Sequence, residues 1–213
     1  MMIWPGEQEA WNILGDLNPG DVAAGAPAFF NARDAAYRLT CCGQDVIVSL
    51  RSRAISSGSG LGALFVGDLG HYSRLSILRY LIHARDLPLS GRLVRPADLP
   101  GGDIFVRGSH ILPLERAAAY FSHQPGEFLG VARSLGGVPE HHGDLAVRLF
   151  PFPRVPVLLI LWLADEEFPP AASLLLDSSC SSYLPPDIVW SVCMLAVEMM
   201  LIGSGARRGA VER

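Results

Sequence analysis

The chain of 213 residues contains no lysine, and all 17 of its basic residues are arginines. This absence excludes a Schiff-base lysine, a P-loop lysine beneath a nucleotide phosphate and a Ser-x-x-Lys nucleophile. Because arginine stays protonated, histidine is the only cationic side chain that can act as a general base. A functional site must therefore rest on carboxylates, histidine, tyrosine or arginine.

Charge is also scarce. Only 18% of the residues are charged, against roughly 25% in an average globular protein, and the mean hydropathy is +0.29. This composition is typical of a compact protein with a large core or a subunit interface. The net charge of −4 and the scattered arginines argue against nucleic acid as a partner. The length favours one domain, which we expect over residues 1–203, with a disordered Arg/Gly-rich tail at 204–213.

The sequence has few cysteines and no hydrophobic run of about 20 residues. None of the four cysteines belongs to a C-x-x-C pair, so we expect reduced, small apolar side chains rather than a metal knuckle. The runs 155–164 and 188–202 are too short to span a bilayer, and residues 1–7 lack the basic flank and apolar core of a secretory signal. We therefore expect a soluble, cytoplasmic protein with no transmembrane segment.

Hydrophobic patterning predicts the main elements. We expect a hairpin of strands 37–42 and 45–50, helices at 71–85, 114–122, 126–135 and 188–202, and strands at 144–150, 157–163 and 173–177. The run 157–163 is continuously apolar, as in a strand buried on both faces. Residues 56–62 are predicted to form a flexible loop without a nucleotide site. Since strands and helices do not alternate regularly, the pattern predicts an α+β fold: a single domain with a mostly antiparallel sheet flanked by helices and an apolar C-terminal helix.

Several short motifs, taken together, point to a family. They are Leu89-Ser90-Gly91, Asp98-Leu99-Pro100-Gly101-Gly102, Leu135-Gly136-Gly137, Gly143-Asp144, Pro153-Arg154-Val155-Pro156, Leu161-Trp162, the segment from Asp165 to Pro170, Asp177 and Tyr183-Leu184-Pro185. With these motifs the chain resembles domain-of-unknown-function family 3786, most densely from about residue 129 to 190.

The resemblance implies a bacterial or archaeal protein of a family common in anaerobes and without an assigned activity. It suggests a setting in iron–sulfur or one-carbon metabolism. Some longer members carry a cysteine-rich segment suggestive of an iron–sulfur cluster, but this chain lacks that segment, so its cofactor stays unknown. The chain also departs from the family at residues 184–187, where members tend to have a hydroxyl residue and acids opening a polar-faced final helix.

The acidic loop Asp165-Glu166-Glu167 follows a predicted buried strand and precedes Phe168-Pro169-Pro170. Adjacent carboxylates repel one another, so a metal, a shared proton or an arginine should compensate them. Candidate arginines are Arg107, Arg148 and Arg154. The three acids are candidate catalytic residues, able to bind a hard cation or act as a general base. The alternative is a solvated hairpin tip with one acid paired to an arginine.

Further candidates lie outside the acidic loop. Trp162, Phe168 and Tyr183 are candidate ligand-binding residues together with Arg148 and Arg154, because aromatic walls and polar ends are typical of ligand pockets. The alternative is that these aromatics belong to the core. His110 is a candidate general base, with a solvated or capping loop histidine as the alternative. His141 and His142 lack an evident third ligand, so no metal site is predicted.

The predicted final helix is apolar on all sides except at Ser191 and Glu198. Such a helix must be buried in the core, in a subunit interface or against a membrane. We expect Trp190, Met194, Val197 and Leu201 to form a self-association surface, and hence a homo-oligomer through residues 188–202.

Two classes of function remain open. The first is a binding or accessory protein that recognises a small molecule or a protein. The second is a small acid–base or metal-assisted enzyme using Asp165, Glu166 and Glu167. An enzyme should hold these acids in a concave pocket beside Trp162 and Tyr183, with at least one raised pKa. A binding protein should carry them on a rim.

Overall fold

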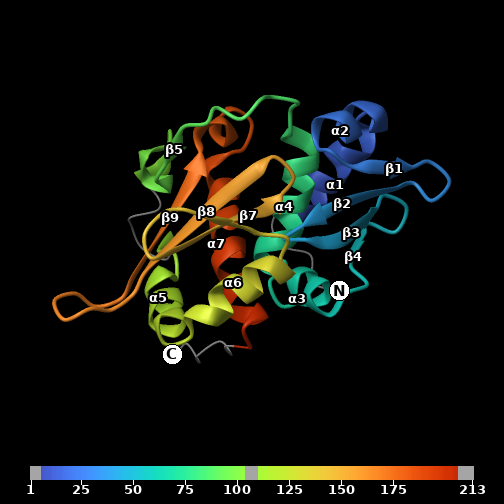
Figure 1. The fold of residues 1–213 in the computed structure, drawn as a ribbon. Coiled ribbons are helices and arrows are strands. Elements are labelled where there is room, and N and C mark those ends of the chain that lie inside the picture. Colours follow the sequence, from blue (N-terminus) through green and yellow to red (C-terminus); the bar gives the residue numbers. More distant parts are fainter. Residues whose placement is uncertain (1–5, 104–109, 206–213) are drawn as a thin grey trace.

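The chain forms two antiparallel sheets, which together with the helices confirm the predicted α+β fold (Figure 1). The computed structural model describes residues 6–103 and 110–205. The first sheet has the order β1 (Phe29–Asn31), β2 (Ala36–Cys41), β3 (Gln44–Ser49) and β4 (Ala54–Ser56). The second has the order β5 (Leu93–Val94), β9 (Ala171–Asp177), β8 (Val155–Trp162), β7 (Leu145–Phe152) and β6 (Val138–Glu140).

The predicted hairpin in the first sheet is confirmed, with its turn one residue earlier than expected. Cys41 pairs with Gln44, so Cys42 and Gly43 form the turn, and both have positive φ values, 47° and 70°. Two positive φ values are typical of the tight hairpin turn whose twist matches the strands. Gly43 is also required by packing, because a Cβ atom there would lie 2.6 Å from the backbone carbon of Leu135.

The second sheet is centred on strand β8, which pairs with β7 on one side and β9 on the other. The continuous apolar run predicted as a buried strand is confirmed, since every residue of β8 except Trp162 is buried. The proline-rich bend between β7 and β8 is a tight hairpin turn. Phe152 pairs with Val155 across it, and Arg154 has a φ of +59°.

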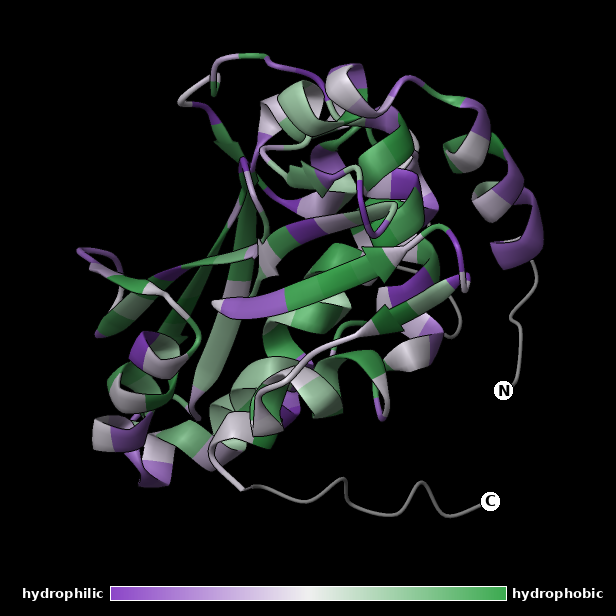
Figure 2. Ribbon diagram, turned by 90° about the vertical axis from the view of Figure 1, so that its right-hand side faces the viewer, coloured by the Kyte–Doolittle hydropathy of each residue, from purple (hydrophilic) through white to green (hydrophobic). Residues whose placement is uncertain are grey.

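The helices surround the sheets and pack on one another. They are α1 (Glu7–Asp16), α2 (Pro19–Gly25), α3 (Gly60–Val66), α4 (Gly70–His83), α5 (Leu114–His123), α6 (Pro125–Ser134) and α7 (Pro186–Gly203), with short 3₁₀ helices η1 (Pro96–Asp98) and η4 (Ser178–Ser182). Figure 2 shows hydrophobic residues concentrated on the central strands and interior helix, and hydrophilic residues on the outer helices and loops.

Helix α7 lies in the middle of the molecule, so the expected self-association surface is wrong. Trp190 is half-buried, and its indole N–H donates to the His110 carbonyl of the same chain. Met194 is 7% exposed, Val197 0% and Leu201 2%, and the helix packs against α4, β7 and α6. These side chains are covered by the rest of the same chain and are not available to a second copy. By length and composition alone α7 could cross a membrane. However, 72% of its 18 residues are buried inside the protein.

The predicted loop at residues 56–62 is a second correction, because α3 begins at Gly60. The Ser59 hydroxyl oxygen accepts a hydrogen bond from the Gly62 amide at 2.9 Å and donates one to Gln44 Oε1 at 2.6 Å. This N-cap starts a helix where the glycines alone favour a loop. All four cysteines are buried, as expected of small apolar side chains, and none of them forms a disulfide. Residues 206–213, in the predicted tail, lie outside the described residues.

Candidate functional site

The two faces of the second sheet differ in what covers them. Side chains from α5, α6 and α7 join the inner face in the main hydrophobic core. The other face, called here the outer face, carries a separate small cluster of Ala146, Leu158 and Ile160, with Leu175 packed against it. A loop lies directly on this cluster: a Cβ atom at Gly143 would be 2.7 Å from Ile160 Cγ2.

Large apolar side chains remain exposed around the small cluster on the outer face. Strand pairing places Val138, Leu93 and Trp162 on the same side of the sheet as Leu158. The exposed fractions are 46% for Leu89, 37% for Leu93, 52% for Val138, 40% for Trp162 and 65% for Phe168. Single exposed apolar residues are normal, but a group of them around one sheet face is typical of an interaction surface.

Two cavities open on the outer face. The smaller, about 120 Å³, contains Arg148 and Asp177 among apolar side chains that include Leu89 and Leu158. The larger, about 520 Å³, lies where β8 ends and the β8–β9 hairpin begins, and it is called here the Trp162 cavity. Its lining consists of Asp144, Trp162, Leu163, Asp165, Phe168, Pro169 and Ala171. The structure therefore brings together three of the predicted site residues, Trp162, Asp165 and Phe168.

The two carboxylates of the Trp162 cavity are held by backbone amides. The Leu163 N–H donates to Asp144 Oδ2 at 2.7 Å. Asp165 Oδ1 accepts from the N–H of Phe168 at 2.7 Å and of Glu167 at 2.8 Å, and these two hydrogen bonds lower the pKa of Asp165. Asp165 is thus fixed as an ionised carboxylate in the hairpin turn.

The acidic loop forms the exposed tip of the β8–β9 hairpin, and two of its three predicted arginine partners, Arg148 and Arg154, form ion pairs elsewhere. Arg148 pairs with Glu140 at 2.6 Å, and Arg154 pairs with Asp86 at 2.9 Å. Repulsion within the loop is relieved instead by solvent around the exposed Glu166 and Glu167 and by the amides that bind Asp165. Arg107 lies outside the described residues.

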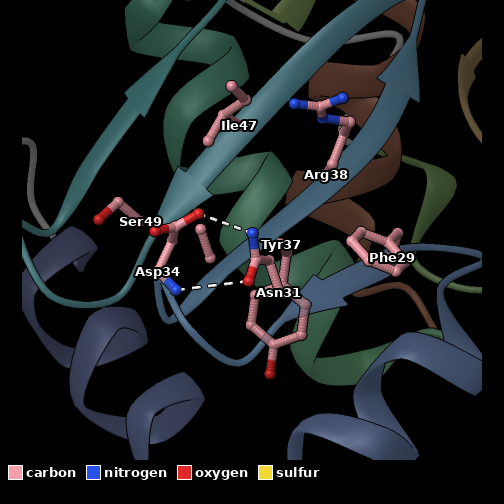
Figure 3. Close-up of a pocket in the computed structure, with 8 residues that line it drawn as sticks. Phe29, Asn31, Asp34, Tyr37, Arg38, Ile47 and Ser49 are labelled. Carbon is pink, nitrogen blue, oxygen red and sulfur yellow. Dashed lines mark hydrogen bonds between the residues drawn. The ribbon is translucent and has the colours of Figure 1, made fainter.

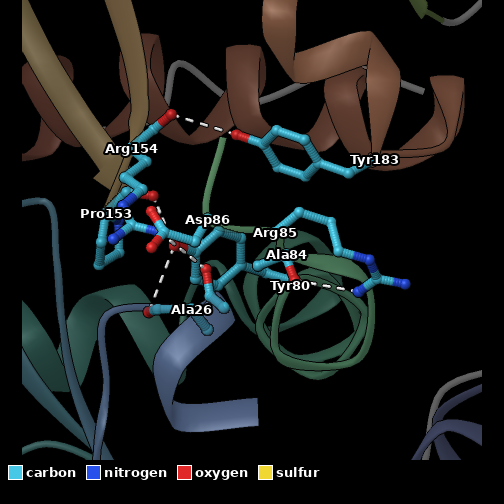
Figure 4. A network of polar contacts seen from close by, with 9 residues as sticks. Ala26, Tyr80, Ala84, Arg85, Asp86, Pro153, Arg154 and Tyr183 are labelled. Carbon is cyan, nitrogen blue, oxygen red and sulfur yellow. Dashed lines mark hydrogen bonds and ion pairs between the residues drawn. The ribbon is translucent and has the colours of Figure 1, made fainter. Parts of the chain in front are cut away.

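Arg154 and Tyr183 lie at the opposite end of β8, in a network of polar contacts (Figure 4). The Tyr183 hydroxyl donates to the Arg154 carbonyl at 3.1 Å, and the Tyr80 hydroxyl lies within hydrogen-bonding distance of the carbonyls of Pro153 (2.5 Å) and Ala26 (3.3 Å). Burial raises the pKa of both tyrosines. The strand separates this network from Trp162 by about 23 Å, at roughly 3.3 Å per residue. These two candidates therefore belong to the scaffold.

His110 contacts Trp190 rather than the acidic loop. The indole N–H of Trp190 donates to the His110 carbonyl at 2.8 Å, and the centroids of the two rings are 4.8 Å apart. Over residues 6–103 and 110–205, no three His, Cys, Asp or Glu side chains are grouped closely enough to bind a metal ion.

The sequence reasoning missed a cavity of about 490 Å³ on the first sheet (Figure 3). Its lining includes Phe29, which is 67% exposed, as well as Arg38 and Ile47. Asn31 donates to Asp34 Oδ2 at 2.6 Å at one side of it. The sequence carries no signal for this cavity, because the exposure of Phe29 at the edge of the sheet is visible only in the folded structure. Asp144 was missed as a site residue too, although it belongs to the Gly143-Asp144 motif.

The fold and the cavities define a small α+β protein with an exposed apolar face on its second sheet and an acidic hairpin beside that face. The family model for a domain of unknown function (DUF3786) matches residues 18–199, so the chain belongs to this family, as its motifs suggested. No curated protein and no solved structure matches the chain.

Proposed function

We propose that the chain is a binding protein that recognises a partner protein through the outer face of its second sheet. The observation that carries this proposal is the group of exposed apolar side chains around Leu158, from Leu89 and Val138 to Trp162 and Phe168. Burying such side chains against a partner is favourable by about 25 cal/mol per Å² of apolar area. Aromatic side chains at the centre of an interface contribute most.

The charges around the outer face define the chemistry of the partner. Its rim carries Asp144 and the acidic loop Asp165-Glu166-Glu167, while the arginine on the face, Arg148, is already paired with Glu140. An acidic rim around an apolar surface complements a partner surface with basic side chains around an apolar centre. The same rim repels anionic lipid and nucleic acid.

The binding function is better supported than the alternative enzyme. An enzyme built on the acidic loop requires a raised carboxyl pKa and a nearby proton donor. Instead, the pKa of Asp165 is lowered, and Tyr183 lies at the far end of β8. A cytoplasmic location and a role in iron–sulfur or one-carbon metabolism are parts of the proposal that rest on composition and on the family resemblance.

Photo-cross-linking in anoxic cells of the source organism tests the proposal. We would place p-benzoylphenylalanine at Phe168 on the hairpin, and at Phe29 on the first sheet as a matched control, because both phenylalanines are about two-thirds exposed (65% and 67%). Mass spectrometry would identify the captured protein and its cross-linked segment.

We expect a specific partner at position 168 that is not captured at position 29. Its cross-linked segment should carry basic residues, and capture repeated in a cell lysate should fall as salt rises. Equal capture at both positions, capture of a second copy of this chain, or no capture at position 168 would overturn the proposal.

A further inference from the structure

The Trp162 cavity combines aromatic walls with carboxylates. Trp162 and Phe168 are 40% and 65% exposed, and Asp144 and Asp165 also line the cavity. Among the described residues, no arginine or histidine lines the cavity. The negative charges of Asp144 and Asp165 therefore have no cationic partner inside it. A volume of about 520 Å³ has room for one long side chain.

Each carboxylate uses only one oxygen for the fold. Asp144 Oδ2 and Asp165 Oδ1 accept the backbone N–H groups that fix their positions. The second oxygens, Asp144 Oδ1 and Asp165 Oδ2, accept no hydrogen bond from the described part of the chain. Two carboxylate oxygens beside an exposed indole thus remain available to a donor from outside.

We propose that the Trp162 cavity binds an arginine side chain of the partner protein, an inference that rests on the proposed function. A guanidinium is flat, stacks on an indole face and donates several hydrogen bonds in fixed directions. The free oxygens of Asp144 and Asp165 accept those hydrogen bonds, and charge assistance strengthens them. A calcium ion fits less well, because it needs six to eight oxygen ligands and gains nothing from aromatic walls.

An NMR titration with N-acetyl-arginine N-methylamide tests this inference directly. The indole N–H of Trp162 reports on the cavity, and its signal is assigned by its loss in W162F. The indole N–H groups of Trp11 and Trp190 are hydrogen-bonded inside the protein, at Glu7 and at the His110 carbonyl, and serve as internal controls. We expect a saturable shift of the Trp162 signal with a Kd on the order of millimolar, since one side chain supplies few contacts.

An uncharged probe and conservative variants distinguish specific recognition of the guanidinium charge from non-specific contact with the cavity. N-acetyl-citrulline N-methylamide, which has nearly the same shape without the charge, should bind at least about fivefold more weakly. D144N and D165N keep an oxygen for the backbone amides and remove the charge, and each should weaken binding about tenfold. E166Q removes the same charge one residue from Asp165 and should change the affinity less than about twofold.

Equal affinity for the two probes, or equal effects of D165N and E166Q, would overturn the inference. This outcome is distinct from failure of the proposed function. If position 168 still captures a partner while the arginine probe does not bind, the outer face recognises a partner by other contacts. If the probe binds and no partner is captured, the cavity recognises arginine, but the proposed function fails.

Discussion

The two ends of strand β8 have opposite characters. At the Val155 end, the polar groups of Tyr80, Tyr183 and Arg154 are paired within the protein and join several elements. At the Trp162 end, an indole is 40% exposed, and carboxylate oxygens of Asp144 and Asp165 are free to accept donors. The polar groups of the first end are therefore satisfied by the scaffold, whereas those of the second end are open to a partner; the two are called here the closed and the open end. A polar side chain whose hydrogen bonds are satisfied within the protein is explained by the fold, whereas one with a free acceptor can still bind a ligand.

The largest effect is expected from Asp177→Ala, at the closed end. Asp177 is 3% exposed, directly follows Leu176, which pairs with Val157 of β8, and accepts hydrogen bonds from Ser90, Gly91 and Ser179. Removing the carboxylate leaves several backbone N–H groups without an acceptor, so the free energy of unfolding should fall by about 3 kcal/mol. Urea denaturation measures this change. A loss below about 1 kcal/mol would show that the closed end is not a scaffold.

Asp177 also gives the closed end a pH dependence. Burial would raise the pKa of Asp177, but the hydrogen bonds from Ser179 and Ser90 outweigh burial and lower it to about 2. The stabilisation is present above about pH 4, where the unfolded carboxyl ionises, and is lost as the pH falls towards 2. The difference in unfolding free energy between the wild type and D177N should shrink by about 2 kcal/mol between pH 5 and pH 2. A difference that is constant with pH would contradict this.

Tyr183→Phe should have a smaller effect at the same end. The variant removes one hydroxyl and leaves the Arg154 carbonyl without its donor. The expected loss is about 1 kcal/mol in the free energy of unfolding, with no change in partner capture at position 168. A loss of capture under conditions where the variant is folded would place Tyr183 in the binding surface.

The open end is expected to show the largest effect on capture. Trp162→Ser removes a side chain that is 40% exposed and otherwise packed against the protein, so the free energy of unfolding should fall by about 2 kcal/mol. Under conditions where the variant is folded, capture at position 168 should fall at least tenfold, since an aromatic anchor contributes about 2 kcal/mol or more to an interface. W162F should retain part of the capture.

The sequence predicts the fold better than it predicts the site. A continuous apolar run identified strand β8 and an apolar stripe identified helix α4, because burial there follows a simple pattern. The start of α3 was missed, since a single serine cap outweighs the local glycines. The prediction that α7 lies in an interface between copies was also wrong. The sequence of an apolar helix is the same whether its own chain or a second copy covers it.

The sequence identified candidate site residues, but it could not separate those that line the cavity from those that belong to the scaffold. Trp162, Asp165 and Phe168 are close in the chain and share one cavity, so proximity predicted that group correctly. Tyr183 and Arg154 were candidates of the same kind, yet they hydrogen-bond to each other at the other end of the sheet. The missing information was strand register, which decides the end and face on which a side chain lies.

One paired measurement tests the central claim that the closed end is scaffold and the open end is a binding surface. Partner capture at position 168 and urea denaturation are measured for W162S and Y183F side by side. We predict that W162S loses capture under conditions where it is folded, while Y183F loses about 1 kcal/mol of stability and keeps capture. The claim is contradicted if W162S captures the partner as the wild type does, or if Y183F abolishes capture while folded.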